Sequence, residues 1–315
     1  MESEKGIREK LRQLLKTINA TLFGKPEVVE KVVTCLFAGG HLLIEDMPGV
    51  GKTTLAFALA RAVNGTFSRI QFTSDLLPSD ILGTRIYRRG SETFEFIPGP
   101  IFAHFVLADE LNRAPPKTQS ALLQAMNEEC VTVERQTYPL EAPFMVIATQ
   151  NPRGYHGTYP LPESQRDRFL MRVSIGYPDR ATEIRILGET RDEPLLSGVV
   201  PIFSPDQVTE VQRQVRAIKV PEPCLSYMAR LAEATRRHDE VIIPISPRGT
   251  IALMRAAQAL AYIRGMEWVD IDILKELAPS ILAHRLALRL LHNDSVLEGA
   301  PAAWIERELL QKVPI

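Results

Sequence analysis

The sequence predicts an α/β fold, in which a five-stranded parallel sheet with helices on both faces is followed by a smaller, all-helical domain. Short apolar runs bounded by turn residues recur in the first half of the chain, and helical patterns such as 53–63 and 117–128 lie between most of them. Strand signals largely stop after Gly176-Tyr177-Pro178. Strands that alternate with helices indicate a parallel sheet. The five expected strands are residues 41–45, 67–72, 101–108, 144–149 and 169–175.

Two helices are expected before the first strand. Apolar residues recur at helical spacing between Ile7 and Ile18, and Gly24-Lys25-Pro26 breaks that helix before a second one at 27–38. Two hairpins are expected to interrupt the alternation of strands and helices. Residues 84–97 alternate polar and apolar types around a turn, and residues 131–140 form a shorter pattern of the same kind.

We place the domain boundary near residue 178, so that residues 1–178 form the α/β domain and 179–315 the helical lid. In the second domain Ser246-Pro247 predicts a helix start, with Ser as cap and Pro in the first turn. Gly265 stands where a helix end is expected.

Composition excludes several classes of protein. The chain has 315 residues, of which 37 are Lys or Arg and 38 Asp or Glu, so its net charge of −1 argues against a protein that coats nucleic acid or an anionic membrane. Its three cysteines are far apart in sequence, which disfavours a disulfide framework or a cysteine zinc site. The N-terminus does not resemble a secretory signal, and no apolar run approaches the roughly eighteen residues of a membrane span. We therefore expect a soluble, cytoplasmic protein.

A phosphate-binding loop is indicated between the first strand and the next helix. Residues 46–53 read Asp46-Met47-Pro48-Gly49-Val50-Gly51-Lys52-Thr53, close to the G-x-x-x-x-G-K-[ST] pattern. Glycines let the backbone turn tightly so that its N–H groups meet phosphate, and the helix N-terminus adds positive potential. Lys52 would reach the β- and γ-phosphate oxygens, and the Thr53 hydroxyl could ligate Mg²⁺. Asp46 replaces the first glycine, and we expect it to tolerate positive φ.

An acidic pair ends the third expected strand. Asp109 and Glu110 follow an apolar run, and the carboxyl ends of parallel strands share one crevice. We expect Asp109 to lie beside the phosphate loop and hold Mg²⁺, and Glu110 to polarise the attacking water. Taken alone, an Asp-Glu pair is as compatible with a solvated turn.

Three further polar positions are candidates. Asn151 ends the fourth strand and could orient water, although Asn-Pro is also an ordinary turn. Arg166 and Arg168 precede the fifth strand and are either surface charges or an arginine finger for a neighbouring subunit's γ-phosphate. Arg248 lies in the first turn of a lid helix, where the macrodipole does not favour a cation, so it could grip phosphate across the domain cleft.

Together these motifs resemble the MoxR family of AAA+ ATPases over nearly the whole chain. The stretches that carry the resemblance are residues 44–53, 70–81, 108–119 and 157–163. Asp46 in place of the first glycine is usual in that family. The resemblance implies an AAA+ P-loop core, an insert at about 73–97 that projects toward a ring's pore, and a second pore-side loop at 152–162 with Tyr155 and Tyr159.

The resemblance also assigns roles to individual residues. It implies that ATP is bound by Phe23 and Gly24, by Arg248, by Asp109 and by the Walker A segment Asp46, Met47, Pro48, Gly49, Val50, Gly51, Lys52, Thr53 and Thr54. Thr53 and Asp109 would hold Mg²⁺. Glu110, Asn151, Arg168 and Arg248 would be the catalytic base, sensor 1, arginine finger and sensor 2. Arg166 stands where related proteins usually carry an apolar residue, which leaves open which arginine is the finger.

Three functions follow from these features. The first is a nucleotide-dependent homo-oligomer, most simply a hexamer, that hydrolyses ATP to remodel a protein partner; the resemblance implies a chaperone-like role, often on proteins with a von Willebrand A domain. The second is a DNA-remodelling motor of the MCM or RuvB type, because Arg85, Arg88 and Arg89 lie on the expected hairpin. The third is a scaffold that binds ATP without turnover, against which the intact Glu110, Asn151 and Arg168 argue.

Overall fold

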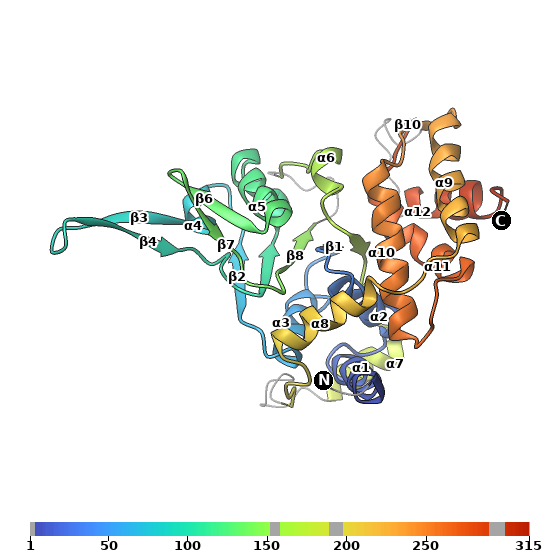
Figure 1. The fold of residues 1–315 in the computed structure, drawn as a ribbon, viewed down its shortest axis with the longest axis horizontal. Helices are drawn as coiled ribbons and strands as arrows, with labels where there is room; N and C mark the ends of the chain where they lie inside the picture. The colour runs from blue at the N-terminus through green and yellow to red at the C-terminus, as the bar shows by residue number, and fades with distance from the viewer. Residues whose placement is uncertain (1–3, 152–157, 189–197, 290–299, 315) are drawn as a thin grey trace.

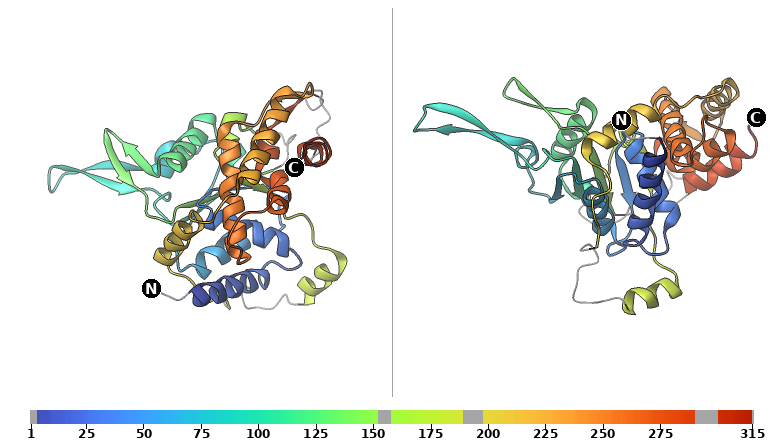
Figure 2. Two further views of the ribbon diagram at one scale, coloured as in Figure 1. Left: turned by 45° about the vertical axis from the view of Figure 1, so that its right-hand side comes forward. Right: turned by 60° about the horizontal axis from the view of Figure 1, so that its bottom comes forward.

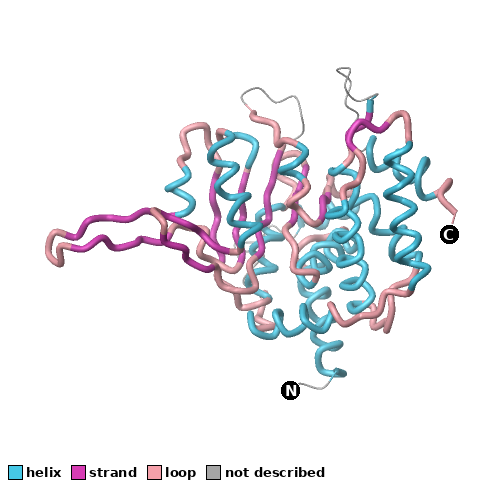
Figure 3. The backbone as a smooth tube through the Cα atoms, turned by 45° about the horizontal axis from the view of Figure 1, so that its top comes forward, coloured by secondary structure: helices cyan, strands magenta, loops and turns pink. Residues whose placement is uncertain are grey.

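The computed structural model describes residues 4–151, 158–188, 198–289 and 300–314. Its centre is a parallel sheet of five strands in the order β2-β5-β8-β1-β9 (Figures 1 and 3), as predicted. Strand β1 lies between β8 and β9, which both come later in the chain. The loop that follows β1 therefore leaves the sheet at a point where the strand order reverses. Open α/β sheets bind ligands at such points. The strands are β1 Leu42–Glu45, β2 Phe67–Gln71, β5 Phe105–Asp109, β8 Met145–Gln150 and β9 Met171–Val173.

The central strands β1, β5 and β8 are apolar up to their carboxyl ends because both of their faces are covered. Phe105 and Leu107 of β5 belong to one buried cluster, whereas Val106 and Ala108 belong to the other. The first cluster includes residues of α1, α2 and α3 together with the lid helices, and the second includes residues of α5. Alternation of side chains between two apolar layers explains why polar residues in these strands are confined to their carboxyl ends.

Helices flank the sheet and form most of the second half of the chain (Figure 1). Those of the first half are α1 Glu4–Asn19, α2 Pro26–Phe37, α3 Lys52–Ala62, α4 Pro78–Leu82, α5 Pro116–Glu128 and α6 Glu163–Arg166. Those of the second half are α7 Arg180–Gly188, α8 Pro205–Val215, α9 Glu222–Arg237, α10 Pro247–Ile263, α11 Ile271–Leu282 and α12 Ala300–Trp304. Short helical turns occur at Leu111–Arg113, Ala283–Arg285 and Ile305–Leu310.

Both predicted hairpins are present. The first pairs β3 Gly83–Arg88 with β4 Thr93–Pro98, and it projects from the body in every view of Figures 1 and 2. The second pairs β6 Cys130–Val133 with β7 Gln136–Pro139 and supports the first, because the Phe96 ring stacks on Tyr138 at a centroid distance of 3.9 Å.

The carboxyl-terminal part is a helical lid, as predicted, and it also contains one short two-stranded ribbon. Strand β10 Val241–Ile243 pairs with β11 Ala287–Leu288. The expected start of α10 is confirmed, since Ser246 Oγ accepts a hydrogen bond from the Gly249 amide at 3.2 Å. No described helix is both long and apolar enough to cross a bilayer. The boundary near residue 178 remains a prediction. Helix α8, which follows it in sequence, packs against α2 of the sheet domain, where Gln212 donates to the Leu36 carbonyl at 2.8 Å.

Two expected strands are shorter than predicted. Residues 101–104 precede β5 as a turn, because the amides of Phe102 and Ala103 are bonded locally to Gly99 and Ile101 carbonyls at 3.2 and 2.8 Å. Residues 169–170 precede β9, where the chain is bonded instead to the lid. An apolar run marks a buried segment, and the backbone partners decide how much of it is strand.

Candidate active site

The loop between β1 and α3 turns at two glycines. Gly49 and Gly51 have φ of 86° and 97°, a region that favours glycine, which confirms the reason given for their presence. Gly51 caps α3, so the free amides of the first helical turn face the loop. Lys52 folds back over the loop, where its Nζ donates to the Asp46 carbonyl at 2.7 Å.

Beside this loop lies a cleft of about 440 Å³. Five residues singled out in sequence meet there from three segments: Lys52 and Thr53 from the start of α3, Asp109 and Glu110 from the end of β5, and Asn151 after β8. The whole lining is Pro48, Gly49, Gly51, Lys52, Thr53, Thr54, Arg69, Gln71, Asp109, Glu110 and Asn151. Asp46, Met47 and Val50 belong to the loop but not to this lining.

Asp46 differs from the expectation. Its φ is not positive, and its carboxylate points away from the cleft toward the chain that follows β9. Asp46 Oδ2 accepts hydrogen bonds from the amides of Ile175 and Gly176, the latter at 2.9 Å, and from Ser174 Oγ at 3.2 Å. The carboxylate therefore ties the phosphate loop to the end of the neighbouring strand, and only its carbonyl faces Lys52.

Asp109 is held by two neighbours across the sheet. Thr149 of β8 donates to Asp109 Oδ1 at 2.7 Å, and Arg69 of β2 pairs with Oδ2 at 2.6 Å. The Thr149 oxygen also accepts from the Glu110 amide at 2.9 Å. One hydroxyl thus positions both members of the acidic pair, and Arg69 pairs with the Asp109 carboxylate.

Glu110 has a left-handed backbone with φ of 56°, which aims its side chain into the cleft and away from the strand. Its Oε1 accepts from Asn151 Nδ2 at 3.2 Å. Its Oε2 accepts from Gln71 Nε2 at 2.9 Å and pairs with Arg113 at 3.1 Å. Three partners therefore orient the carboxylate, which lines the cleft.

The cleft contains both a lysine and carboxylates, a combination that suits a phosphate group bound together with a divalent cation. Burial lowers the pKa of Lys52, and the nearby carboxylates of Asp46, Asp109 and Glu110 oppose that change. The oxygens of Thr53 and Asp109 line the same cleft. Oxygen donors of this kind, few in number and beside a phosphate site, fit Mg²⁺, which usually combines one or two protein ligands with water and substrate phosphate.

Arg166 and Arg168 have different surroundings. Arg166 pairs with Glu163 at 3.0 Å and lines a neighbouring cavity of about 490 Å³ that also borders Asn151. Arg168 lies at the end of α5, where its Nη1 donates to the Leu123 carbonyl at 2.5 Å. With its carbonyl oxygen turned toward Arg168, the Asn127 amide accepts from Nη1 at 2.7 Å and from Nε at 3.2 Å. Neither arginine lines the cleft of the phosphate loop.

Arg248 is exposed at the start of α10, and it does not line the cleft of its own chain either. It lies near Arg168: its positive charge helps burial to lower the pKa of Arg168, while Glu128 opposes both. The grip of Arg248 on phosphate across the domain cleft therefore remains a prediction, and in this structure Arg248 lies near Arg168 and outside the lining of the cleft.

Phe23 and Gly24 lie next to residues of α7. Arg185 stands over the Phe23 ring at 4.2 Å, and a Cβ at Gly24 would meet Thr182 Oγ1 at 2.7 Å. The preceding Leu22 approaches the position of a Cβ on Gly51 to 3.1 Å. In the loop expected to lie on the pore side, Tyr159 is 43% exposed, whereas Tyr155 lies outside the described residues.

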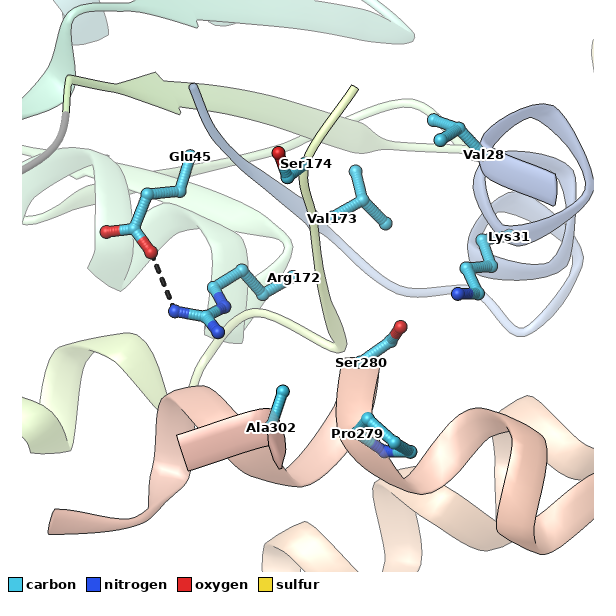
Figure 4. Close-up of a pocket in the computed structure, with 9 residues that line it drawn as sticks. All are labelled: Val28, Lys31, Glu45, Arg172, Val173, Ser174, Pro279, Ser280 and Ala302. Atoms are coloured by element: carbon cyan, nitrogen blue, oxygen red, sulfur yellow. Dashed lines mark hydrogen bonds and ion pairs between the residues drawn. The ribbon is translucent and has the colours of Figure 1, made fainter. Parts of the chain in front are cut away.

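A further cavity, of about 400 Å³, lies between the β9 edge, α2 and α11 (Figure 4). Glu45, the last residue of β1, turns toward it and pairs with Arg172 at 2.7 Å. Gln150 holds the other carboxylate oxygen of Glu45 at 2.6 Å. Glu45 thus faces away from the nucleotide cleft, although it lies next to the phosphate loop in sequence.

Sequence reasoning missed four residues that organise the cleft: Arg69, Gln71, Arg113 and Thr149. Gln71 stands opposite Asp109 in the register of β2 with β5. The rule used for Asp109, a polar residue at the carboxyl end of a strand, could have found Gln71 and Thr149. Nothing in the sequence indicates the Arg69 pair, because the strand pairing that forms it joins residues 40 positions apart.

Comparison with known proteins identifies relatives of the chain. Residues 41–171 match the model of an "ATPase family associated with various cellular activities (AAA)", and residues 233–302 match an AAA lid domain. The chain is 42% identical to the Bacillus subtilis protein YeaC, over 100% of this chain and 98% of that protein. It is 40% identical to Chaperone MoxR1 of Mycobacterium tuberculosis, over 88% and 76% of the two chains.

A crystal structure from Cytophaga hutchinsonii, provisionally named an ATPase, superposes with a TM-score of 0.86 at 35% identity and covers 97% of this chain and 96% of that one. The DNA-motor alternative gains no support from these relatives. On this likeness and on the geometry of the cleft, the chain belongs to the MoxR family of AAA+ ATPases.

Proposed function

We propose that this protein is a Mg²⁺-dependent ATPase that assembles with copies of itself and uses hydrolysis to remodel or activate a protein partner. The observation that carries the proposal is the convergence of Lys52, Thr53, Asp109, Glu110 and Asn151 on one cleft of about 440 Å³. Each brings the chemistry that phosphoryl transfer to water requires.

The chain's own groups divide the work as follows. Amides of the phosphate loop and the N-terminus of α3 receive the phosphates, and Lys52 leaves the Asp46 carbonyl to bind the β- and γ-oxygens. Thr53 and Asp109 would hold Mg²⁺, which neutralises charge on the phosphate oxygens when bound. Phe23 and Gly24 are proposed to lie against the adenine base.

Glu110 and Asn151 act on the attacking water. As the water oxygen attacks the γ-phosphorus, the bond to the β–γ bridging oxygen breaks and the Glu110 carboxylate accepts the water's proton. Asn151, which donates to Glu110 at 3.2 Å, keeps that carboxylate aimed at the water. The left-handed backbone of Glu110 serves the same purpose.

We infer that the cleft is completed by a neighbouring subunit. Among its described lining residues the one arginine is Arg69, which is occupied by Asp109. Arg168 and Arg248 lie outside this cleft, and their charges are near enough to influence each other, which favours an anionic partner. Presented to the next subunit's triphosphate, they would stabilise charge in the transition state. A head-to-tail contact of this kind closes into a ring, for which we propose a hexamer.

The partner is proposed to be a protein, with a von Willebrand A domain as the candidate class. The projecting β3–β4 hairpin exposes Tyr87 and Phe94 at its outer half. Its arginines are partly neutralised, since Arg88 pairs with Glu95 at 2.5 Å and Arg85 with Glu134 at 3.6 Å. This surface suits a polypeptide better than a phosphate backbone, and DNA affinity that falls steeply with salt would contradict it.

The test is steady-state ATP hydrolysis with two variants. Glu110→Gln should bind a fluorescent ATP analogue with little change in affinity and lose about 10²–10⁴-fold in turnover, because only the proton acceptor is removed. Lys52→Ala should weaken binding itself. Glu141→Gln, the same change at an exposed site, is the control. Normal hydrolysis by Glu110→Gln would refute the assigned base.

A further inference from the structure

A buried arginine lies at the contact between the lid and the segment that carries Arg168. Arg285 ends the helical turn after α11, and it is 5% exposed. A buried guanidinium is costly unless its charge is paired and its N–H groups are bonded. Burial lowers its pKa, and the charge of Asp167 acts in the opposite sense.

The guanidinium binds the backbone on both sides of residue 168. Its Nε donates to Asp167 Oδ1 at 2.7 Å, and its Nη2 donates to the Phe169 carbonyl at 2.6 Å. Its Nη1 donates to the carbonyls of Leu170, at 3.1 Å, and of Ile281 at the end of α11. One side chain therefore fixes residues 167, 169 and 170 relative to a lid helix.

Asp167 extends the same network to Arg248. Its second oxygen accepts from Ser246 Oγ at 3.3 Å, and Ser246 caps the helix in whose first turn Arg248 lies. The stem of Arg285 packs on this turn as well: a Cβ at Gly249 would approach Arg285 Cδ to 3.0 Å. The segments that carry Arg168 and Arg248 are thus joined through two partly buried polar contacts, Arg285 to Asp167 and Ser246 to Asp167.

We propose that Arg285 is a positioning residue, which through Asp167 locks the peptide of Arg168 to the helix of Arg248 so that both arginines meet a neighbour's triphosphate as one unit. The inference deepens the proposed function and rests on it. Arg285 itself touches no nucleotide, and the cleft of its own chain lies elsewhere.

The experiment mixes subunits that are defective in different halves of the site. Arg285→Gln alone should lose about a hundredfold in turnover at saturating ATP, because small displacements of a transition-state group are costly. Its affinity for a fluorescent ATP analogue should stay near that of the unaltered chain. When it is mixed in equal amounts with Glu110→Gln before nucleotide is added, about a quarter of the normal rate should return, since one interface in four then pairs two intact halves.

Two controls accompany the mixture. Arg264→Gln removes another ion pair between lid and core, the one to Glu30 at 2.8 Å, and should leave turnover within about twofold of normal, as is usual for exposed pairs. The mixture of Arg168→Ala with Glu110→Gln reports whether the arginine acts between subunits at all. If Arg285→Gln does not fold, Asp167→Asn takes its place, because it keeps the shape of the side chain and removes the charge that pairs with Arg285. The same loss of turnover and the same recovery in the mixture are expected for it.

Normal turnover by Arg285→Gln alone would overturn the inference. So would a mixture of Arg285→Gln with Glu110→Gln that stays inactive while the mixture with Arg168→Ala recovers, because Arg285 would then only stabilise the fold. Failure of both mixtures would instead remove the shared site of the proposed function, and the inference with it.

Discussion

Arg166 and Arg168 are two residues apart, yet their side chains are directed to different surfaces. Arg166 is 12% exposed in its side chain and anchored to Glu163 on its own short helix. Arg168 rests on the carbonyl of Leu123 and lies near the cationic Arg248. Arg166 would have to break its ion pair with Glu163 to turn outward, whereas Arg168 makes no ion pair with a described residue.

We therefore expect Arg168→Ala to lose at least about a hundredfold in turnover, since removal of such a finger costs 10³–10⁵ in related phosphoryl-transfer systems. Arg166→Ala, the matched substitution two positions earlier, should lose less than about tenfold. Steady-state kinetics of the two variants decides between them. A larger loss for Arg166→Ala would assign the finger to that residue.

A buried histidine makes the stability of the sheet depend on pH. His41 Nδ1 accepts from the Val146 amide and its Nε2 donates to the Met126 carbonyl, both at 3.0 Å, so the ring is neutral. Burial lowers its pKa from 6.5 to about 4. The unfolded chain binds the proton first, so this stability is fully present above pH 6.5 and is lost as the pH falls toward 4.

Replacement of the titrating ring should expose that dependence. Between about pH 7.5 and 4.5 the difference in unfolding free energy between the unaltered chain and His41→Gln should shrink by roughly 2 to 3 kcal/mol. Urea unfolding at the two pH values measures it. A difference that stays constant would mean that His41 is protonated equally in both states.

At the scale of single residues, sequence could predict those whose chemistry follows from local order. Gly51, Lys52 and Thr53 are adjacent in the chain, and the strand before them and the helix after them fix where they face. Asp46 could not be predicted in the same way, because its direction depends on amides about 130 residues further on. Arg285 and Asp167, 118 positions apart, illustrate the same limit.

The elements themselves were predictable where periodicity and turn residues agree. The central strands β1, β5 and β8 alternate between two apolar layers, so each appears as an apolar run, and each ends in a polar residue. The length of β9 and the pairing of β10 with β11 could not be predicted, because they depend on partners outside the segment. The same holds for the placement of the lid, which brings α10 to Arg168 and away from the cleft of its own chain.

The β3–β4 hairpin exposes aromatic side chains that a binding partner could cover. Tyr87 and Phe94 pair across it, with rings 5.3 Å apart, and they are 51% and 58% exposed. Paired aromatic side chains on a projecting hairpin present apolar area at low cost in conformational entropy. The stacking of Phe96 on Tyr138 anchors the base, so the outer half can change without loss of the fold.

Replacement of both Tyr87 and Phe94 by Ser should therefore leave basal ATP turnover within about twofold and the free energy of unfolding within about 1 kcal/mol. The same two replacements are then introduced into the Glu110→Gln variant, which should hold ATP, and this protein is immobilised on an affinity column. The column should then retain less of the partner protein than a column that carries Glu110→Gln alone. Leu225→Ser, at an exposed apolar residue of α9, serves as control. Equal retention by both would show that the hairpin does not contact the partner.

At the scale of the whole molecule, the proposed site is divided between two copies of the chain. One copy would supply the phosphate loop, the acidic pair and Asn151. The other would supply Arg168 and Arg248, which lie outside the cleft of their own chain. Hydrolysis would then depend on assembly, and a movement of the lid in one subunit would change the arginines offered to the next.

Electron cryomicroscopy of Glu110→Gln with Mg²⁺ and ATP tests this division most directly. The account predicts a closed ring in which Lys52 and Asn151 of one subunit and Arg168 of its neighbour all contact the same γ-phosphate. A triphosphate contacted by one chain alone, with Arg168 still bonded to the Leu123 carbonyl, would contradict it.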